Sequence, residues 1–192
     1  MKTLLTNAKV IDPVTETISD GEVMFEDGII IPTETADETF DCKGQYISPG
    51  LIDLGVKVGE PGERHKESYK SAGAAAAAGG VTTIITRPDT NPAIDTPEVL
   101  EFIRRRAQEV CPVNVFHMVA LTKERAGREM TEIGFLKDAG AVAFTDFTNV
   151  IKNSKILLRA LSYAKSLDAL VIGHPQDPDL SDDTSATSGK FA

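Results

Sequence analysis

From residue 51 onward, the sequence alternates between short apolar runs rich in β-branched residues and longer segments of helical composition. Strands are expected over residues 51–58, 81–86, 113–120, 141–144 and 169–174. Helices are expected over 63–78, from an N-cap at Thr96 with Pro97 in the first turn, over 131–139 and over 154–167. This alternation is typical of parallel strands joined by crossover helices, in either a doubly wound sheet or a barrel.

The length of the chain limits which of these folds can be complete. No Gly-x-Gly-x-x-Gly pattern follows the first strand, so a dinucleotide-binding sheet has no support. A complete (β/α)8 barrel needs about 250 residues, whereas this chain has 192. Five parallel strands do not close a barrel. We therefore expect a fragment of a longer protein, the other possibility being a truncated relative that needs a partner.

The first 48 residues differ from the rest in predicted secondary structure: short strands and turns follow one another without a helix. The predicted domains are a small β module over residues 1–48 and a partial (β/α) barrel over residues 49–192.

Composition excludes several classes of function. The net charge is −9 and the one basic cluster is Arg104–Arg106, so nucleic acid is not an expected partner. No apolar run reaches about 18 residues, so no membrane span is expected, and the start is too short and too polar for a signal peptide. Cys42 and Cys111 are far apart and are expected to be small buried hydrophobes, with the cytoplasm as the compartment.

Several spaced motifs carry a resemblance to a known family. They are residues 48–54, Glu60–Pro61–Gly62, His65–Lys66–Glu67, 74–83, Arg87–Pro88–Asp89–Thr90–Asn91–Pro92, 120–123 and 138–144. In this order they resemble dihydroorotases of the amidohydrolase superfamily, over nearly all of the chain and a little under half of such an enzyme. Allantoinases and dihydropyrimidinases share the superfamily, but the turn at residues 88–92 fits dihydroorotase better. The resemblance implies a TIM-like (β/α)8 amidohydrolase barrel of which about the first five βα units are present.

The resemblance also implies a zinc site at the carboxyl ends of the strands. In the family, a metal-bound hydroxide opens the ring of dihydroorotate, because zinc lowers the pKa of its bound water to about 7. The first two ligands are a His-x-His pair on the first strand, where residues two apart share a face. Here Gly55 and Lys57 occupy those positions. Glycine has no side chain and an ammonium repels a cation, so catalysis is not expected.

Other family positions are also changed. Gly59 stands where the family has an arginine for the substrate carboxylate, and Asp89 stands where it has an asparagine, so both substrate-binding positions are degenerate. An anionic Asp89 would oppose an anionic substrate. Asp146 and His174 remain as candidate metal ligands. The family's later histidine and its catalytic aspartate would lie beyond Ala192.

Each candidate residue also has a structural interpretation. Asp146 is expected to be a hydrogen-bond acceptor at a strand end, and His174 a surviving ligand position without a metal. His117 is expected to be a satisfied core histidine, and His65 a solvated or capping residue. Lys57 is expected to form an ion pair with a nearby carboxylate, for which the candidates are Asp53, Asp89 and Asp146.

Three functional hypotheses follow from these observations. The first is a non-catalytic dihydroorotase-like protein of pyrimidine biosynthesis that needs no cofactor. By analogy with inactive homologues, it would be an oligomer that acts as a scaffold for aspartate transcarbamoylase. The second is a metal-dependent cyclic-amide hydrolase, of dihydroorotase, allantoinase or dihydropyrimidinase type, that holds zinc in a rearranged site. The third is a partial product or binding module without a role in pyrimidine synthesis.

Overall fold

The computed structural model describes residues 1–181, and its contacts divide the chain into two units. Unit 1 comprises Met1–Gly50, and unit 2 begins at Leu51. No helix within residues 1–181 combines the length and the apolar character that crossing a membrane requires.

Unit 1 is a five-stranded sheet in which a long antiparallel hairpin, β1 and β2, forms the centre. The Asp12 carboxylate accepts hydrogen bonds from the Val14 amide and the Thr15 hydroxyl, both at 2.8 Å, and so fixes the turn between these two strands. Parallel strands β4 and β5 pair with β1, and β3 pairs with β2. The strands are β1 (Lys2–Asp12), β2 (Thr17–Glu26), β3 (Ile29–Ile31), β4 (Glu38–Asp41) and β5 (Tyr46–Ile47).

Unit 2 contains a parallel sheet whose spatial order, β6-β7-β8-β9, follows the sequence order. A doubly wound sheet reverses direction at a switch point, whereas a barrel adds each strand beside the previous one. The observed order is therefore that of a barrel. The strands are β6 (Leu51–Val56), β7 (Val81–Thr86), β8 (Asn114–Val119) and β9 (Ala143–Phe144).

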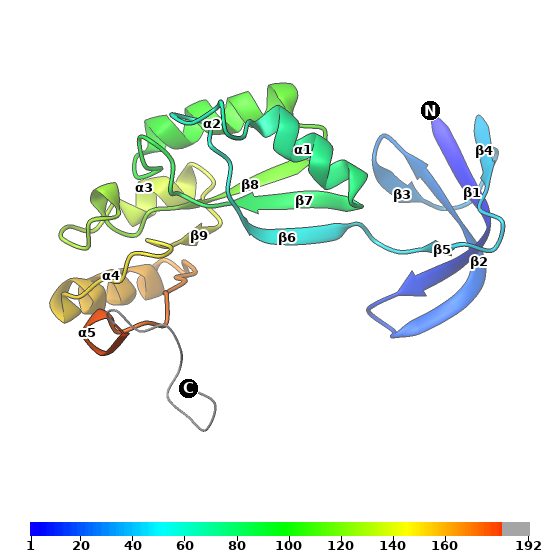
Figure 1. The fold of residues 1–192 in the computed structure, drawn as a ribbon. Helices are drawn as coiled ribbons and strands as arrows, with labels where there is room; N and C mark the ends of the chain where they lie inside the picture. The colour runs from blue at the N-terminus through cyan, green and yellow to red at the C-terminus, as the bar shows by residue number, and fades with distance from the viewer. Residues whose placement is uncertain (182–192) are drawn as a thin grey trace. The chain divides into compact units, whose positions relative to one another are not determined.

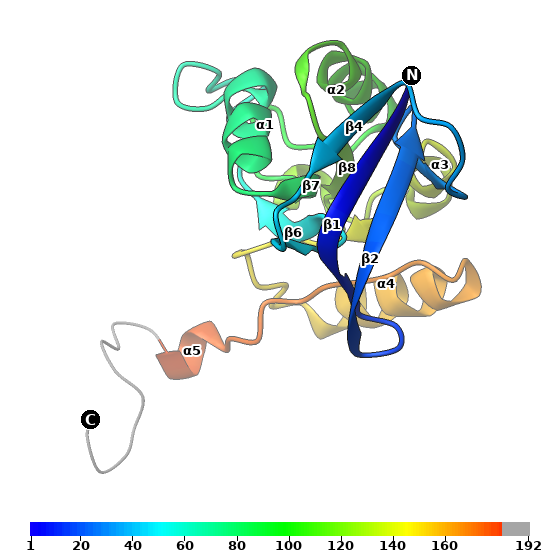
Figure 2. The ribbon, with the colours of Figure 1, turned by 90° about the vertical axis from the view of Figure 1, so that its right-hand side faces the viewer.

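Helices connect these strands, and Figures 1 and 2 show α1 and α2 along the same face of β6, β7 and β8. The N-caps follow from the sequence, since the Thr96 hydroxyl accepts from the Val99 amide and Pro97 opens α2. The elements are α1 (Tyr69–Ala78), α2 (Pro97–Val110), the 3₁₀ turn η1 (Lys123–Arg125), α3 (Ile133–Asp138), α4 (Ser154–Ser166) and α5 (Pro178–Ser181).

Helix α1 begins six residues later than the sequence predicts. The Glu63 amide donates to the Gly59 carbonyl at 2.6 Å, and this bond commits residues 59–63 to a tight turn instead of a helix. Ser68 then caps the helix: it accepts from the Ser71 amide, and the Ser71 hydroxyl accepts in turn from the Ser68 amide.

The predicted fifth strand, residues 169–174, is reduced to a single bridge between Phe144 and Val171. Strand β9 is two residues long and offers Val171 one ladder position, made by the bonds Phe144 N to Leu170 O and Ile172 N to Phe144 O, both 2.9 Å. The prediction of a strand over residues 169–174 is therefore confirmed at Val171 only.

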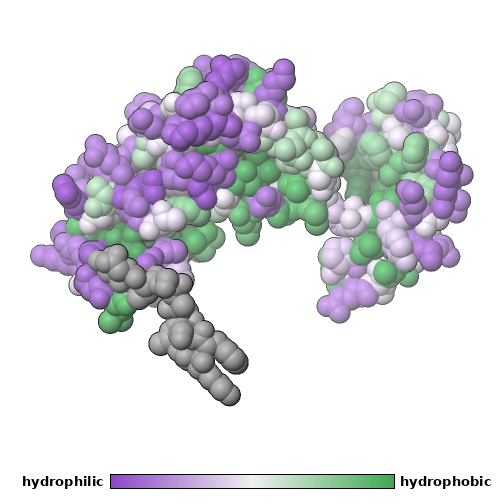
Figure 3. Space-filling model, in the orientation of Figure 1, coloured by the Kyte–Doolittle hydropathy of each residue, from purple (hydrophilic) through white to green (hydrophobic). Residues whose placement is uncertain are grey.

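The core of unit 2 lies between the helices and the sheet. It is built from Ile94, Leu100 and Ile103 around α2, Val119 and Leu121 at the end of β8, and residues of α3 and α4. By contrast, Leu51, Ile52 and Leu54 on the edge strand β6 are exposed. Figure 3 shows apolar surface gathered where β6 and β7 lie.

Candidate functional site

The carboxyl ends of the parallel strands bring together several of the residues that the sequence singles out. Gly55 lies near the end of β6 at a register irregularity, with φ of +86°, a value that glycine adopts without strain. A Cβ placed there would meet a single nearby atom, Cδ of Arg87 at 4.0 Å. The absence of a side chain at Gly55 therefore leaves space that the stem of Arg87 approaches.

Asp89 is the centre of an ion-pair network at the ends of β6 and β7. Arg87 binds it through two parallel bonds, Nε to Oδ1 at 3.0 Å and Nη2 to Oδ2 at 2.7 Å. Lys57, whose side chain is 49% exposed, adds a third contact from Nζ to Oδ2 at 3.2 Å. The guanidinium of Arg87 also lies 3.8 Å from the centroid of the Phe147 ring, which follows β9. We call Lys57, Arg87, Asp89 and Phe147 the strand-end network.

The strand-end network changes the electrostatic role expected for Asp89. Burial raises the pKa of this carboxyl, but the hydrogen bonds from Arg87 and Lys57 outweigh burial and hold the pKa below its usual range. Two cations and one carboxylate leave the group with a net positive charge. Asp89 is thus a paired anion. Of the three carboxylates expected as possible partners of Lys57, Asp89 is the one that forms the ion pair.

Asp146 is buried after β9 and is fully engaged by the loop that follows β8. Its Oδ1 accepts from the amides of Leu121 and Thr122 at 3.0 and 2.9 Å, and its Oδ2 accepts from the Thr122 hydroxyl. Burial raises the pKa of the Asp146 carboxyl above its ordinary value, although these bonds act in the opposite direction. The contacts match the expected structural acceptor that joins two loops.

His174 lies on an exposed segment beyond the bridge at Val171, and its Nε2 is 2.9 Å from Oε1 of Gln176. His174 and Asp146 line the same small cavity of 100 Å³, but no hydrogen bond joins them. His65 is exposed, as expected for a solvated residue.

Gly59 is explained by the turn in which it lies. Its amide donates to the Glu67 carbonyl at 3.0 Å while its own carbonyl accepts from Glu63. A Cβ at this position would be 2.4 Å from the Glu63 carbonyl oxygen, far inside contact distance. The loop therefore has no room for an arginine at position 59.

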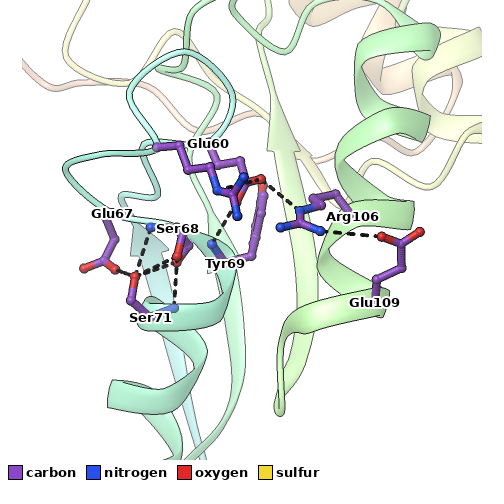
Figure 4. A network of polar contacts seen from close by, with 8 residues as sticks. Glu60, Glu67, Ser68, Tyr69, Ser71, Arg106 and Glu109 are labelled. Atoms are coloured by element: carbon purple, nitrogen blue, oxygen red, sulfur yellow. Dashed lines mark hydrogen bonds and ion pairs between the residues drawn. The ribbon is translucent and has the colours of Figure 1, made fainter.

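Buried Glu60 holds the loop between β6 and α1 in place (Figure 4). Its Oε2 accepts from the Tyr69 amide at 3.2 Å, at the start of α1. Its Oε1 accepts from Nε of Arg106 on α2 at 2.9 Å, and Arg106 also pairs with Glu109 at 3.6 Å. One carboxylate thus ties the loop to two helices.

His117 is only partly the satisfied core histidine that the sequence predicts. It is 1% exposed, and its Nδ1 lies 2.8 Å from the Thr86 hydroxyl. Its Nε2, however, is buried without a hydrogen-bond partner. The ring also packs edge-to-face against Tyr69, with centroids 5.9 Å apart.

Within residues 1–181, the side chains at the strand ends do not by themselves supply the ligands of a zinc site. Zinc sites in proteins use at least three side-chain ligands drawn from cysteine, histidine and carboxylates. Within residues 1–181, no group of three such side chains is placed to hold a metal ion. Asp89 is paired with both Arg87 and Lys57, and both oxygens of Asp146 already accept hydrogen bonds.

Three members of this site were not assigned a role from the sequence. Arg87 could have been found from its opposite charge two residues before Asp89 in the same turn. Phe147 and Thr122 carried no such signal, since their contacts join loops that follow different strands.

Comparison with known proteins places the chain in a family. A family model described as "Dihydro-orotase-like" matches residues 44–192. The chain belongs to the dihydroorotase-like family. Among curated relatives of this dihydroorotase-like chain, the dihydroorotase of Wolbachia sp. subsp. Drosophila simulans (strain wRi) is 39% identical over 199 residues, covering 100% of the chain and 44% of the relative. The dihydroorotase of Syntrophus aciditrophicus (strain SB) is 37% identical, covering 100% and 47%. The chain spans less than half the length of these relatives.

Solved structures agree on the fold of the dihydroorotase-like chain. L-hydantoinase (dihydropyrimidinase) from Arthrobacter aurescens superposes with a TM-score of 0.76 at 19% identity, over 90% of this chain and 40% of the other. A dihydroorotase crystal structure gives a TM-score of 0.60 at 16% identity, over 92% and 52%. The parallel sheet of unit 2 therefore has the fold of part of a (β/α)8 barrel.

Proposed function

We propose that this dihydroorotase-like chain comes from a non-catalytic protein of pyrimidine biosynthesis that acts in the cytoplasm as a scaffold for aspartate transcarbamoylase. The strand-end network is the observation that supports the proposed loss of catalysis. Its Lys57–Asp89 ion pair joins the second lost ligand position to the degenerate substrate position. Arg87 passes near Gly55, the first lost ligand position.

The scaffold role is supported by the family relationship and by the partial barrel that unit 2 forms. A closed barrel depends on strand order and on packing between helices and sheet, and neither requires a metal. The partner and the oligomeric state rest on family analogy.

A second candidate is a cyclic-amide hydrolase with a rearranged metal site. The observation in its favour is that Asp146 and His174, the two residual ligand candidates, line one small cavity. Further ligands from the rest of a full-length barrel would be needed, and Asp146 would have to give up hydrogen bonds to Thr122.

The experiment is a metal and activity assay on the full-length protein, purified without chelator. We expect less than stoichiometric zinc and no opening of dihydroorotate. A variant with Gly55→His, Lys57→His and Asp89→Asn serves as the matched control, because it restores the family's side chains at these three positions. Stoichiometric zinc with turnover in the unmodified protein would refute the non-catalytic proposal and favour the second candidate.

The scaffold is tested separately by mixing the full-length protein with aspartate transcarbamoylase from the same organism. We expect a stable complex in light scattering and a transcarbamoylase that is incompletely assembled or less active alone. A transcarbamoylase that is fully assembled and fully active by itself would refute the scaffold role while leaving the loss of catalysis intact.

A further inference from the structure

A cleft of 400 Å³ lies between the loop that follows β8 and the segment that leads into α4. One wall is formed by residues 126–128, and the other by Val150, Lys152, Asn153 and Ile156. We call it the α4 cleft. Its volume lies within the range of small-molecule sites.

Hydrogen bonds between the two segments hold the walls of the α4 cleft in a fixed arrangement. The Gly127 amide donates to the Thr122 hydroxyl at 2.8 Å, and this hydroxyl donates in turn to buried Asp146. Nδ2 of Asn149, one residue before the second wall, donates to the Arg125 carbonyl at 2.9 Å. The cleft is therefore preformed, and a ligand does not have to order either wall when it binds.

The polar side chains that line the α4 cleft offer hydrogen-bond donors. The side chain of Arg128 forms no hydrogen bond or ion pair within residues 1–181, so the five N–H groups of its guanidinium are available. Lys152 adds an ammonium whose contact with Asp179, at 3.3 Å, is exposed on both sides. Oδ1 of Asn153 accepts from two amides in the first turn of α4, which leaves the two N–H groups of Nδ2 for a ligand.

The charge of the α4 cleft is opposite to that of the whole chain. Two cations line the cleft and, among the described residues, no aspartate or glutamate does, although the net charge of the chain is −9. A neighbouring cavity of 270 Å³, which Arg128 also lines, has Glu129 and Glu132 in its wall. Glu129 is paired with Lys123 at 2.5 Å. An anion in the cleft would therefore meet cations and neutral donors, with the nearby carboxylates outside its lining.

We propose that the α4 cleft binds a phosphate group, paired with Arg128 and Lys152 and hydrogen-bonded to Nδ2 of Asn153. A phosphate group has a charge of about −1.5 to −2 at pH 7 and several strong acceptor oxygens, which complements two cations and an amide donor. The exposed contact between Lys152 and Asp179 is readily given up, because such pairs contribute little to stability. This site is independent of the proposed scaffold function.

The phosphate group could be free phosphate or part of a small phosphate ester, and the volume of the α4 cleft admits both. Apolar side chains of both walls border the rest of the cleft and could contact the organic part of an ester. The test is isothermal titration calorimetry of the 192-residue chain with inorganic phosphate and with phenyl phosphate, at constant ionic strength. We expect saturable binding with a Kd below about 1 mM. Tighter binding of phenyl phosphate would identify an ester as the ligand, and equal binding would identify free phosphate.

Arginines inside and outside the α4 cleft provide matched variants. Arg128→Gln should raise the Kd about fivefold or more, because a charge-assisted bond to the phosphate is lost. Arg105→Gln makes the same change of charge at a side chain that is 72% exposed and does not line the cleft, so it should leave the Kd unchanged. Lys152→Gln is a second variant within the cleft and should also raise the Kd. Thermal unfolding of each variant checks that it is folded, which we expect because Arg128 has no partner within residues 1–181.

Three results would overturn the proposal. The first is the absence of saturable binding of either phosphate compound up to about 10 mM. The second is an equal loss of affinity in the Arg128 and Arg105 variants, which would indicate attraction to general surface charge. The third is binding of acetate as tight as that of phosphate at the same ionic strength, which would show that the cleft does not select a phosphate group.

Discussion

At the scale of single residues, the strand-end network shows how side chains from the ends of β6, β7 and β9 fit together. Gly55 leaves space near the stem of Arg87, Arg87 binds Asp89 through two bonds, and Phe147 covers the guanidinium. Lys57 completes the group with a half-exposed contact. The bidentate pair is the stronger part, because both partners are largely buried and the geometry is parallel.

Replacement of Asp89 by asparagine should lower the free energy of unfolding by about 1–3 kcal/mol at pH 7, since Arg87 then loses its partner. Lys57→Ala should cost less than about 1 kcal/mol, because its ion pair is half exposed. Urea unfolding measures both changes. Equal effects of the two substitutions would contradict the ranking of the two contacts.

The unmodified chain and the Asp89→Asn variant should also differ in how their stability depends on pH. The pKa of Asp89 is lowered in the folded state, so its stabilising contribution is present above the ordinary pKa of 3.8 and is lost as the pH falls through the lower folded value. The difference in stability between the unmodified chain and Asp89→Asn should therefore be constant near neutral pH and shrink below about pH 4. A difference that grows on acidification would show that the sign of the shift is wrong.

Gly59 offers a steric prediction with an internal comparison. Gly59→Ala should lower the free energy of unfolding by about 1–3 kcal/mol, because the new Cβ meets the Glu63 carbonyl oxygen. Gly173→Ala should be nearly neutral, since nothing lies within 4 Å of a Cβ there and its φ is not positive. Chemical denaturation of the two variants gives the comparison, and a neutral Gly59→Ala would mean that the turn at residues 59–63 relaxes freely.

At the scale of elements, a buried carboxylate contacts both α1 and α2 in addition to their apolar packing. Ser68 and Thr96 decide where the helices begin, and Glu60 decides how the first of them is held against the second. The helices follow sequence signals closely where a cap is present. The helix predicted from residue 63 does not form over residues 63–68, because backbone hydrogen bonds hold this segment in turns.

Glu60→Ala should lower the free energy of unfolding by about 3 kcal/mol or more, because Arg106 and the Tyr69 amide lose a buried partner together. Glu109→Ala, which removes the exposed partner of the same Arg106, should cost less than about 1 kcal/mol. Thermal unfolding of the two variants separates the contributions. Similar losses would mean that Glu60 acts as a surface ion pair.

At the scale of the whole molecule, β6 is the edge of the parallel sheet within residues 1–181. Leu51, Ile52 and Leu54 on this strand are exposed, and in a complete (β/α)8 barrel a further strand would pair with β6. In the order β6-β7-β8-β9, β6 is the first strand and therefore an edge.

The 192-residue chain should consequently enhance the fluorescence of anilinonaphthalene sulfonate in its folded state. Leu54→Gln should reduce that enhancement, because Leu54 is one of three exposed apolar side chains on β6. Val14→Gln, in the turn between β1 and β2, is the control and should change it little, since Val14 lies outside β6. No enhancement, or equal reductions, would show that the β6 surface is covered in solution.

The sequence by itself determined the alternation of strands and helices and the cap at Thr96. These features depend on local periodicity, on hydrogen bonds within a few residues of one another and on the chemical type of single side chains. They can therefore be predicted without knowing which distant segments meet.

Only the tertiary structure decided which carboxylate binds Lys57, how the strands are ordered and how short the fifth strand is. It also decided that Nε2 of His117 has no hydrogen-bond partner within residues 1–181. Each of these outcomes depends on contacts between loops or strands far apart in the chain, such as Lys57 with Asp89 and Arg87 with Phe147. Sequence patterns limit the candidates for such contacts, but the packing of the parallel sheet selects among them.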